Sequence, residues 1–144
     1  IIPKFIILGG APLLNKQILN IPEVGVLNAH PGLLPQARGM DVVENSILNG
    51  IPCGVTLFKV DIGIDTGPVY KKVELHNYNK MNIDRIRYEL EKLCGEIIVE
   101  LFKDSENGEI EFKVQEKNKS NLFYSLSRQD YYKAKSILAN LNQV

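Results

Sequence analysis

Two polar side chains close an apolar segment near the start of the sequence, where they could take part in a reaction. Asn28 and His30 end the run VGVLNAH and are followed directly by the loop PGLLPQARG. Because one residue separates them, an extended strand directs both side chains to the same face. A polar group at the end of a buried strand is costly unless it has a partner or a task. An amide that donates a hydrogen bond beside an imidazole that exchanges protons would have such a task.

A third candidate, Asp65, stands between Gly63 and Gly67 in the string DIGIDTGP. Glycines allow tight turns and a close approach of backbone to a ligand, and a carboxylate beside an imidazole sets its tautomer. Together Asn28, His30 and Asp65 would form an acyl-transfer site without a nucleophilic side chain. For Asp65 alone, capping of its own turn is the simpler explanation. The other histidine of the chain lies in the polar stretch LHNYNK and is interpreted as a surface residue.

The elements around these residues predict an α/β fold. The segments KFIILGG and VGVLNAH are short apolar runs typical of strands buried on both faces of a parallel sheet, and APLLNKQILN between them predicts one or two helical turns. Ligands of such sheets bind beyond the carboxyl ends of the strands. Asn28 and His30 lie at such an end.

The remainder of the chain supplies further elements. Apolar spacing and capping residues predict a helix over 40–50, strands over 54–60 and 67–75 joined by the acidic turn, a long helix over 81–104 with one apolar stripe, a turn and an exposed strand over 105–117, and a terminal helix over 125–141. We interpret the long helix as core scaffolding. Ser127 and Asp130 have the spacing of a capping box at the start of the terminal helix.

The composition limits the classes of partner. The 144 residues include 17 basic and 17 acidic ones and are 44% hydrophobic, which suits one domain over residues 1–144. Without a net field we expect neither nucleic acid nor a membrane as a partner. Cys53 and Cys94 lie in apolar surroundings without metal-ligand spacing, so we expect reduced thiols in a cytoplasmic protein and no metal site.

The strings NAHPGLLPQARG and GVTLFKVDIGIDTGPVY, one helix apart, resemble the signature of the 10-formyltetrahydrofolate-dependent formyltransferases. These include glycinamide ribonucleotide, methionyl-tRNA and nucleotide-linked amino-sugar N-formyltransferases and the related formyltetrahydrofolate hydrolase. The resemblance covers roughly residues 5–75, about half of the chain. It implies a Rossmann-like, parallel-dominated sheet with C-terminal helices.

The resemblance also implies roles for single residues. Asn28 would donate to the formyl oxygen, His30 would stabilise the tetrahedral intermediate and help proton transfer, and Asp65 would support His30 and receive the amine proton. The folate co-substrate, 10-formyltetrahydrofolate, would bind between two loops, whose residues are Gly10, Ala11, Pro12, Leu13 and Leu14, with Asp61, Ile62, Gly63 and Ile64. No metal is implied.

Two departures from the family pattern stand out. Ala29 replaces a larger aliphatic residue, which changes packing only. The βαβ unit with a Gly-rich loop that begins other family members has no counterpart here, since the sequence starts at IIPKFIILGG without Met. We therefore expect a catalytic domain that is incomplete at its N-terminus, either trimmed or naturally reduced. Gln36 and Arg38 could contact an acceptor phosphate or could equally be surface residues.

The expected reaction is transfer of a formyl group from 10-formyltetrahydrofolate to a primary amine. The acceptor would be a small phosphorylated or nucleotide-linked molecule, such as an amino-sugar nucleotide or glycinamide ribonucleotide. The alternatives are a formyltetrahydrofolate hydrolase, a methionyl-tRNA formyltransferase-like protein, and a folate-binding remnant without catalysis. A homodimer is left open.

Overall fold

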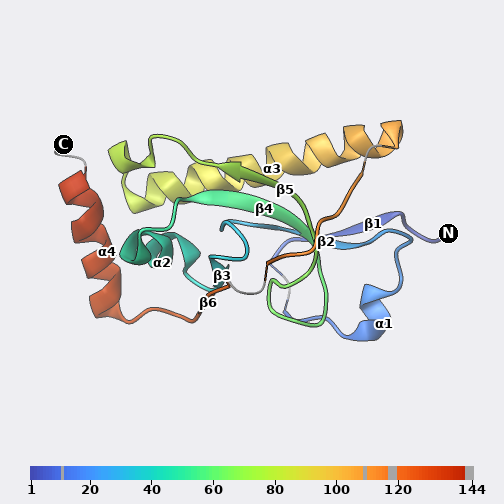
Figure 1. Cartoon of the computed structure of the whole chain (residues 1–144), viewed down its shortest axis with the longest axis horizontal. Helices are drawn as coiled ribbons and strands as arrows, with labels where there is room; N and C mark the ends of the chain where they lie inside the picture. The colour runs from blue at the N-terminus through green and yellow to red at the C-terminus, as the bar shows by residue number, and fades with distance from the viewer. Residues whose placement is uncertain (11, 109, 117–119, 142–144) are drawn as a thin grey trace.

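The computed structural model, which describes residues 1–10, 12–108, 110–116 and 120–141, consists of a small sheet with one long helix along one face (Figure 1). In chain order the elements are β1 (Phe5–Leu8), α1 (Lys16–Leu19), β2 (Gly25–His30), β3 (Arg38–Gly39), α2 (Val42–Asn49), β4 (Gly54–Lys59), β5 (Val69–Glu74), the 3-10 helix η1 (Tyr78–Lys80), α3 (Ile83–Asn107), β6 (Leu122–Phe123) and α4 (Arg128–Leu141). Among the described helices, none has the length and apolar character needed to cross a membrane.

The main sheet has the strand order β1-β2-β4-β5. The predicted α/β class with C-terminal helices is confirmed. Within this sheet, however, only β1 and β2 are parallel, whereas β4 runs antiparallel to both β2 and β5. The sheet is therefore mixed rather than parallel-dominated. A short loop suffices to join the antiparallel strands β4 and β5, whereas a parallel pair would need a crossover between them.

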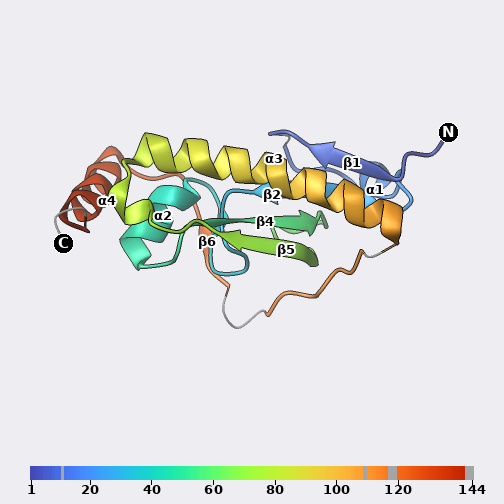
Figure 2. The ribbon, with the colours of Figure 1, turned by 90° about the horizontal axis from the view of Figure 1, so that it is seen from above.

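Helix α3 covers one face of the sheet (Figure 2). Leu27 and Leu57 of the strands pack against it in the main core cluster. The predicted apolar stripe of the helix faces this cluster: Ile86, Leu90, Ile97 and Leu101 are buried, and Leu93, Cys94 and Ile98 are partly buried against it. Asn82 caps the first turn, since its Oδ1 accepts from the Arg85 N–H at 2.8 Å. The helix ends at Asn107, beyond the predicted residue 104, because Gly108 takes the left-handed conformation that closes a helix.

Two predictions about strands are wrong. The residues of β1 are half-buried throughout, because β1 lies at the edge of the sheet rather than inside it. Among the described residues of 105–117, the predicted exposed strand is reduced to a bridge in which Lys113 pairs with Val69; residues 109 and 117 lie outside the described residues. The first residues of the segment 105–117 continue α3, while Ile110 and Phe112 pack on the core. The alternating apolar residues therefore belong to an extended chain, whose described residues pair with β5 at Lys113.

The chain after this bridge returns to the loop that follows β2. There β6 pairs with β3 in a second, two-stranded parallel sheet. Helix α4 then packs on α2. The predicted cap of α4 is confirmed, since Ser127 Oγ accepts from the Asp130 N–H at 3.1 Å and donates to its carboxylate at 2.7 Å.

Candidate active site

His30 is the last residue of β2 and lies on the face of the sheet opposite α3. The alternation of a strand places Leu27 and Ala29 against the core under α3, and it directs Asn28 and His30 to the other face. The side chain of His30 is 6% exposed. The predicted shared face of Asn28 and His30 is therefore present.

The loop 31–37 folds back over this face and contacts His30. Thr56 holds the loop, since its hydroxyl donates to the Gly32 carbonyl at 2.7 Å and accepts from the Leu34 N–H at 3.1 Å. The loop thereby brings the Ala37 carbonyl within 2.8 Å of His30 Nε2. Because a carbonyl oxygen only accepts, we assign the proton of the neutral ring to Nε2. Nδ1 then has a lone pair that can accept a proton.

Asp65 faces that second nitrogen of His30. Its Oδ2 lies 3.8 Å from His30 Nδ1 and accepts a hydrogen bond from the Gly39 N–H at 2.8 Å. The backbone of Asp65 is left-handed, with φ of 52°. The structure therefore brings together two residues that are 35 positions apart in the sequence, 30 and 65, in a geometry where the carboxylate can stabilise a protonated imidazole.

Asn28 lies on the same face of β2, two residues before His30. It is half-buried and opposite Phe58 in the strand pairing. Among the described residues, no hydrogen bond to its side chain is found. Its amide is therefore available to donate to an oxygen held near His30.

The two loops expected to hold the folate follow β1 and β4, the two strands that pair with β2. Leu8 pairs with Asn28, so the loop that contains Gly10, Pro12, Leu13 and Leu14 starts next to Asn28; Ala11 lies outside the described residues. The second loop is ordered by Asp61, whose Oδ1 accepts from the Gly63 N–H at 3.0 Å and from Thr66 Oγ1 at 2.6 Å.

Both loops carry exposed apolar side chains. The residues Leu13 and Ile62 are 72% and 69% exposed, and Ile64 is 36% exposed. Asp61 and Ile62 also line a cavity of about 510 Å³ next to α1. Exposed apolar side chains on glycine-containing loops suit a flat, aromatic ligand, so the residues present fit the folate that the sequence predicts.

A cavity of about 280 Å³ opens beside His30, between α2 and α3. Its charged lining residues are Asp41, Glu44, Arg87 and Glu91, so three are acidic and one is basic. Glu44 is 1% exposed and is paired with the Arg87 guanidinium, while its Oε2 has no hydrogen-bond partner among the described residues. No sequence pattern predicts this pair, because Glu44 and Arg87 fall within ordinary helical patterns.

The cysteines offer no nucleophile at neutral pH. Both are free thiols. Burial, reinforced by the charge of Glu44, raises the pKa of Cys53 to about 12, and burial raises that of Cys94 to about 11. A thiol is a nucleophile only as the thiolate.

Within the described part of the chain, no group of three or more histidine, cysteine, aspartate or glutamate residues could hold a metal ion.

Arg38, expected either at an acceptor phosphate or at the surface, is bonded to neighbouring loops. Its Nε donates to the Ile64 carbonyl at 2.8 Å and its Nη1 to Ser120 Oγ at 2.6 Å. Gln36 is half-buried and lines a separate cavity beside β5.

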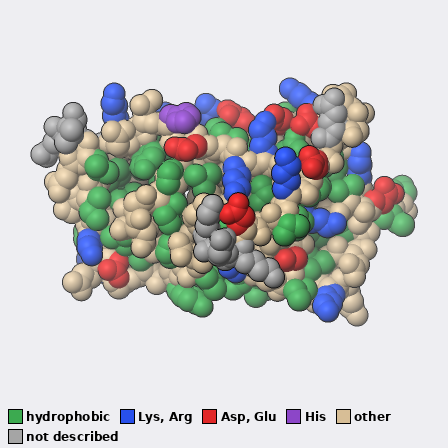
Figure 3. Space-filling model, in the orientation of Figure 1, with side chains coloured by type: hydrophobic (Ala, Val, Ile, Leu, Met, Phe, Trp, Pro, Cys, Tyr) green, Lys and Arg blue, Asp and Glu red, His purple; other side chains and the backbone are tan. Residues whose placement is uncertain are grey.

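On the face seen in Figure 3, acidic and basic side chains are interspersed, so that face has no area of one charge sign that would attract a polyanion.

Known proteins share this sequence pattern and this architecture. The family model described as formyl transferase matches residues 3–102. A methionyl-tRNA formyltransferase of Chloroflexus aggregans is 32% identical over 119 residues, which are 82% of this chain and 38% of that protein. The chain spans about two-fifths of the length of the curated relatives that it matches.

Two solved structures are similar in fold. One is the formyltransferase PseJ from Anoxybacillus kamchatkensis, in complex with UDP-4,6-dideoxy-4-formamido-L-AltNAc and tetrahydrofolate. It superposes with a TM-score of 0.75 at 24% identity, and the match covers 90% of this chain and 67% of the PseJ chain. The N-formyltransferase from Helicobacter canadensis, in complex with folinic acid and dTDP-3-aminofucose, has a TM-score of 0.62 at 26% identity and covers 72% of this chain and 38% of its own.

Proposed function

We propose, from the premise that this chain belongs to the formyl transferase family, that it carries the catalytic centre of a folate-dependent N-formyltransferase. The enzyme would transfer a formyl group from 10-formyltetrahydrofolate to a primary amine. The observation that carries the proposal is the approach of Asp65 to His30, whose Nδ1 lies 3.8 Å from Asp65 Oδ2, with Asn28 on the same face of β2.

The proposed reaction uses each of these groups once. The ammonium group of the acceptor first loses a proton to solvent. The neutral amine nitrogen then attacks the formyl carbon, and the Asn28 amide donates to the oxygen that becomes negative. His30 Nδ1 accepts the proton that the amine loses, and Asp65 stabilises the resulting imidazolium. The bond between the formyl carbon and N10 of the folate then breaks, and the proton goes to N10. The products are the formamide and tetrahydrofolate.

The donor would lie against the loops that contain Gly10–Leu14 and Asp61–Ile64. Leu13 and Ile62 would contact the flat pterin through their exposed side chains, and backbone groups of the glycine-containing loops would hydrogen-bond its edge. This assignment follows the expectation from the sequence and is supported by the fit of the loops to such a ligand.

The proposed acceptor is a small phosphorylated or nucleotide-linked amine, such as an amino-sugar nucleotide or glycinamide ribonucleotide. The acidic lining of the cavity beside His30 favours an amine, which arrives as an ammonium ion, over a phosphate at that position. The nucleotide sugars bound to the two solved relatives support this class for those proteins. A methionyl-tRNA acceptor is the second candidate, because the curated relatives have that activity.

The experiment is to incubate the purified protein with 10-formyltetrahydrofolate and each candidate amine and to follow the release of tetrahydrofolate. We expect amine-dependent turnover that falls roughly 100- to 10,000-fold in His30→Ala, the range for loss of an acid–base group. His76→Ala, which changes the exposed second histidine, should keep the activity.

Other outcomes of the same experiment assign other functions. Donor turnover without any amine would identify a hydrolase, and tight binding of the donor without turnover would identify a folate-binding module. Unchanged activity in His30→Ala would contradict the proposed site. A cytoplasmic location and a homodimer remain predictions; the free thiols are compatible with a reducing compartment.

A further inference from the structure

The loop that carries Asp65 adopts a conformation that its own residues do not favour. Asp65 has φ of 52°, in the left-handed region, where a non-glycine residue persists only when its surroundings hold it. Two residues further on, Gly67 lies so close to Lys59 that a Cβ would stand 1.7 Å from its carbonyl oxygen. The contacts that hold the loop therefore decide where the Asp65 carboxylate points.

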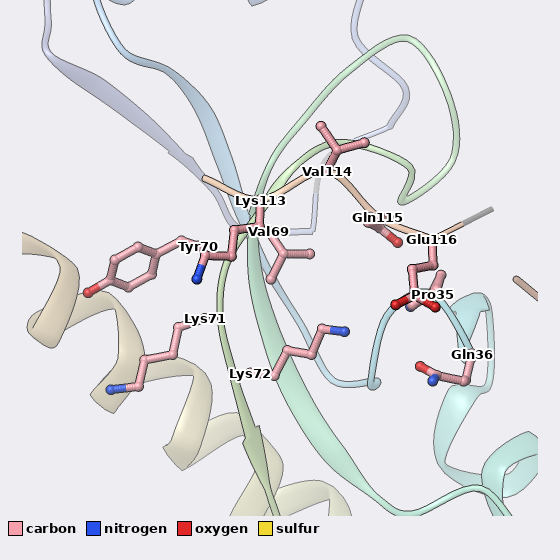
Figure 4. Close-up of a pocket in the computed structure, with 10 residues that line it drawn as sticks. All are labelled: Pro35, Gln36, Val69, Tyr70, Lys71, Lys72, Lys113, Val114, Gln115 and Glu116. Carbon is pink, nitrogen blue, oxygen red and sulfur yellow. The ribbon is translucent and has the colours of Figure 1, made fainter. Parts of the chain in front are cut away.

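Gln115 supplies two of these contacts. Its Nε2 donates to the Asp65 carbonyl at 3.0 Å and to the Gly67 carbonyl at 2.7 Å. Gln115 is itself placed by a backbone bridge two residues earlier, in which Val69 N donates to Lys113 O at 2.8 Å and Lys113 N donates to Val69 O at 2.7 Å. Figure 4 shows this segment running across the start of β5, next to Pro35.

The opposite side of the loop is held by the chain around β3. Arg38 Nε donates to the Ile64 carbonyl, and the Gly39 N–H donates to the Asp65 carboxylate. The carbonyls of Ile64, Asp65 and Gly67 are thus each engaged by a side chain from outside the loop. Among the described residues, Gln115 alone is found to donate from a side chain to those of Asp65 and Gly67.

We infer that Gln115 is a positioning residue for formyl transfer, which holds the Asp65 loop so that the carboxylate faces His30 Nδ1. The inference rests on the proposed function. It concerns a residue beyond 102, where the match to the family model ends. Carbonyl oxygens require a donor, and the amide nitrogen supplies both hydrogen bonds. The buried Oε1 of Gln115 has no partner among the described residues, so the donor half of the amide makes the contacts found.

Three substitutions separate donation from packing. Gln115→Met keeps the length without a donor, Gln115→Glu sets an acceptor against two carbonyl oxygens, and Gln115→Lys restores a donor with a poorer shape. We expect kcat for formyl transfer to fall roughly 10- to 100-fold in Gln115→Met and at least as far in Gln115→Glu, since a small misplacement of a catalytic group costs this much. Gln115→Lys should retain more activity than either.

The control variant is Gln129→Met, at an exposed position of α4, which should keep the kcat of the wild type. Thermal unfolding of every variant shows whether it is folded at the assay temperature. If Gln115→Met and Gln115→Glu keep wild-type kcat, or if Gln115→Lys is the least active of the three, Gln115 acts through packing or not at all, and the inference is overturned.

A second readout does not depend on activity. In proton NMR spectra the ring signals of His30 should shift in Gln115→Met, because its facing carboxylate has moved, while those of His76 stay in place. Absence of turnover in the wild type with every amine and with water would remove the proposed function. In that case the His30 signals still decide the geometric claim, and unchanged signals in Gln115→Met would overturn it.

Discussion

His30 has a different partner on each ring nitrogen. Nε2 is 2.8 Å from the Ala37 carbonyl, and Nδ1 faces Asp65. The first contact sets the orientation and the tautomer of the neutral ring, and the second offers charge compensation when the ring takes up a proton. Gly32 permits this arrangement, because a Cβ there would lie 2.8 Å from His30 Nε2 and 2.7 Å from the Ala37 oxygen.

Asn28 tests the oxyanion part of the proposed reaction. We expect Asn28→Ala to lower kcat roughly 100- to 1,000-fold, the usual cost of removing one donor to a developing negative charge. KM for the amine should change much less, because the lost interaction strengthens only in the transition state. Steady-state kinetics with saturating donor measures both constants. Asn79→Ala, at an exposed position of η1, is the matched control, and equal kcat in the two variants would exclude the proposed role.

Strand β2 and the loop between β4 and β5 bring the site together. β2 supplies Asn28 and His30, whereas β4 runs antiparallel to it and ends opposite the start of β2, where Val60 N donates to Val26 O at 2.7 Å. The loop that follows then folds back and brings Asp65 to His30. The loop closes on β4 where Lys59 N donates to Pro68 O at 2.8 Å. This closure leaves no space for a side chain at Gly67.

A pair of glycine substitutions compares this loop with a helix. In Gly67→Ala the new Cβ meets backbone, so we expect a loss of stability of roughly 1–3 kcal/mol and, because Asp65 moves with the loop, reduced activity. Gly95 lies in α3, where an added Cβ would meet nothing within 4 Å. Gly95→Ala should therefore stabilise the protein by about 0.5–1 kcal/mol and leave activity unchanged. Urea unfolding gives both values, and a neutral Gly67→Ala would show that the loop yields easily.

The molecule as a whole divides its sheet between a structural and a reactive face. Helix α3 covers one face with the main core, whereas the opposite face carries the smaller cluster of Leu34, Phe58 and Val69 and the candidate site. Cys53 belongs to the main core and is 2% exposed. Its thiol therefore reports on the integrity of the core.

Stability should decline in alkali because of Cys53. Its pKa is raised to about 12 in the folded protein, whereas an unfolded thiol titrates near about 8.5. Between these values the folded state binds more protons than the unfolded state, so the free energy of unfolding falls with rising pH by up to about 1.4 kcal/mol per pH unit. Chemical unfolding from pH 8 to 11 measures the slope. Cys53→Ala should show a smaller slope, and an equal one would assign the effect to other groups.

Local patterns in the sequence were sufficient for several parts of the fold. The apolar period predicted α3, the apolar period and the cap at Ser127 predicted α4, and the spacing of Asn28 and His30 predicted their common face. Each of these features depends on residues a few positions apart, where backbone geometry alone relates the side chains. The family motif further predicted that Asp65 joins them.

Contacts between distant segments could not be predicted in this way. Three such contacts join segments far apart in the chain. They are the antiparallel pairing of β4 with β2, the ion pair of Glu44 with Arg87, and the hydrogen bonds of Gln115 to the Asp65 loop. Gln115 stands in a charged, extended segment whose pattern is typical of an exposed strand. Its partners depend on how the chain crosses the start of β5, and that path is set by packing of the folded molecule rather than by the order of neighbouring residues.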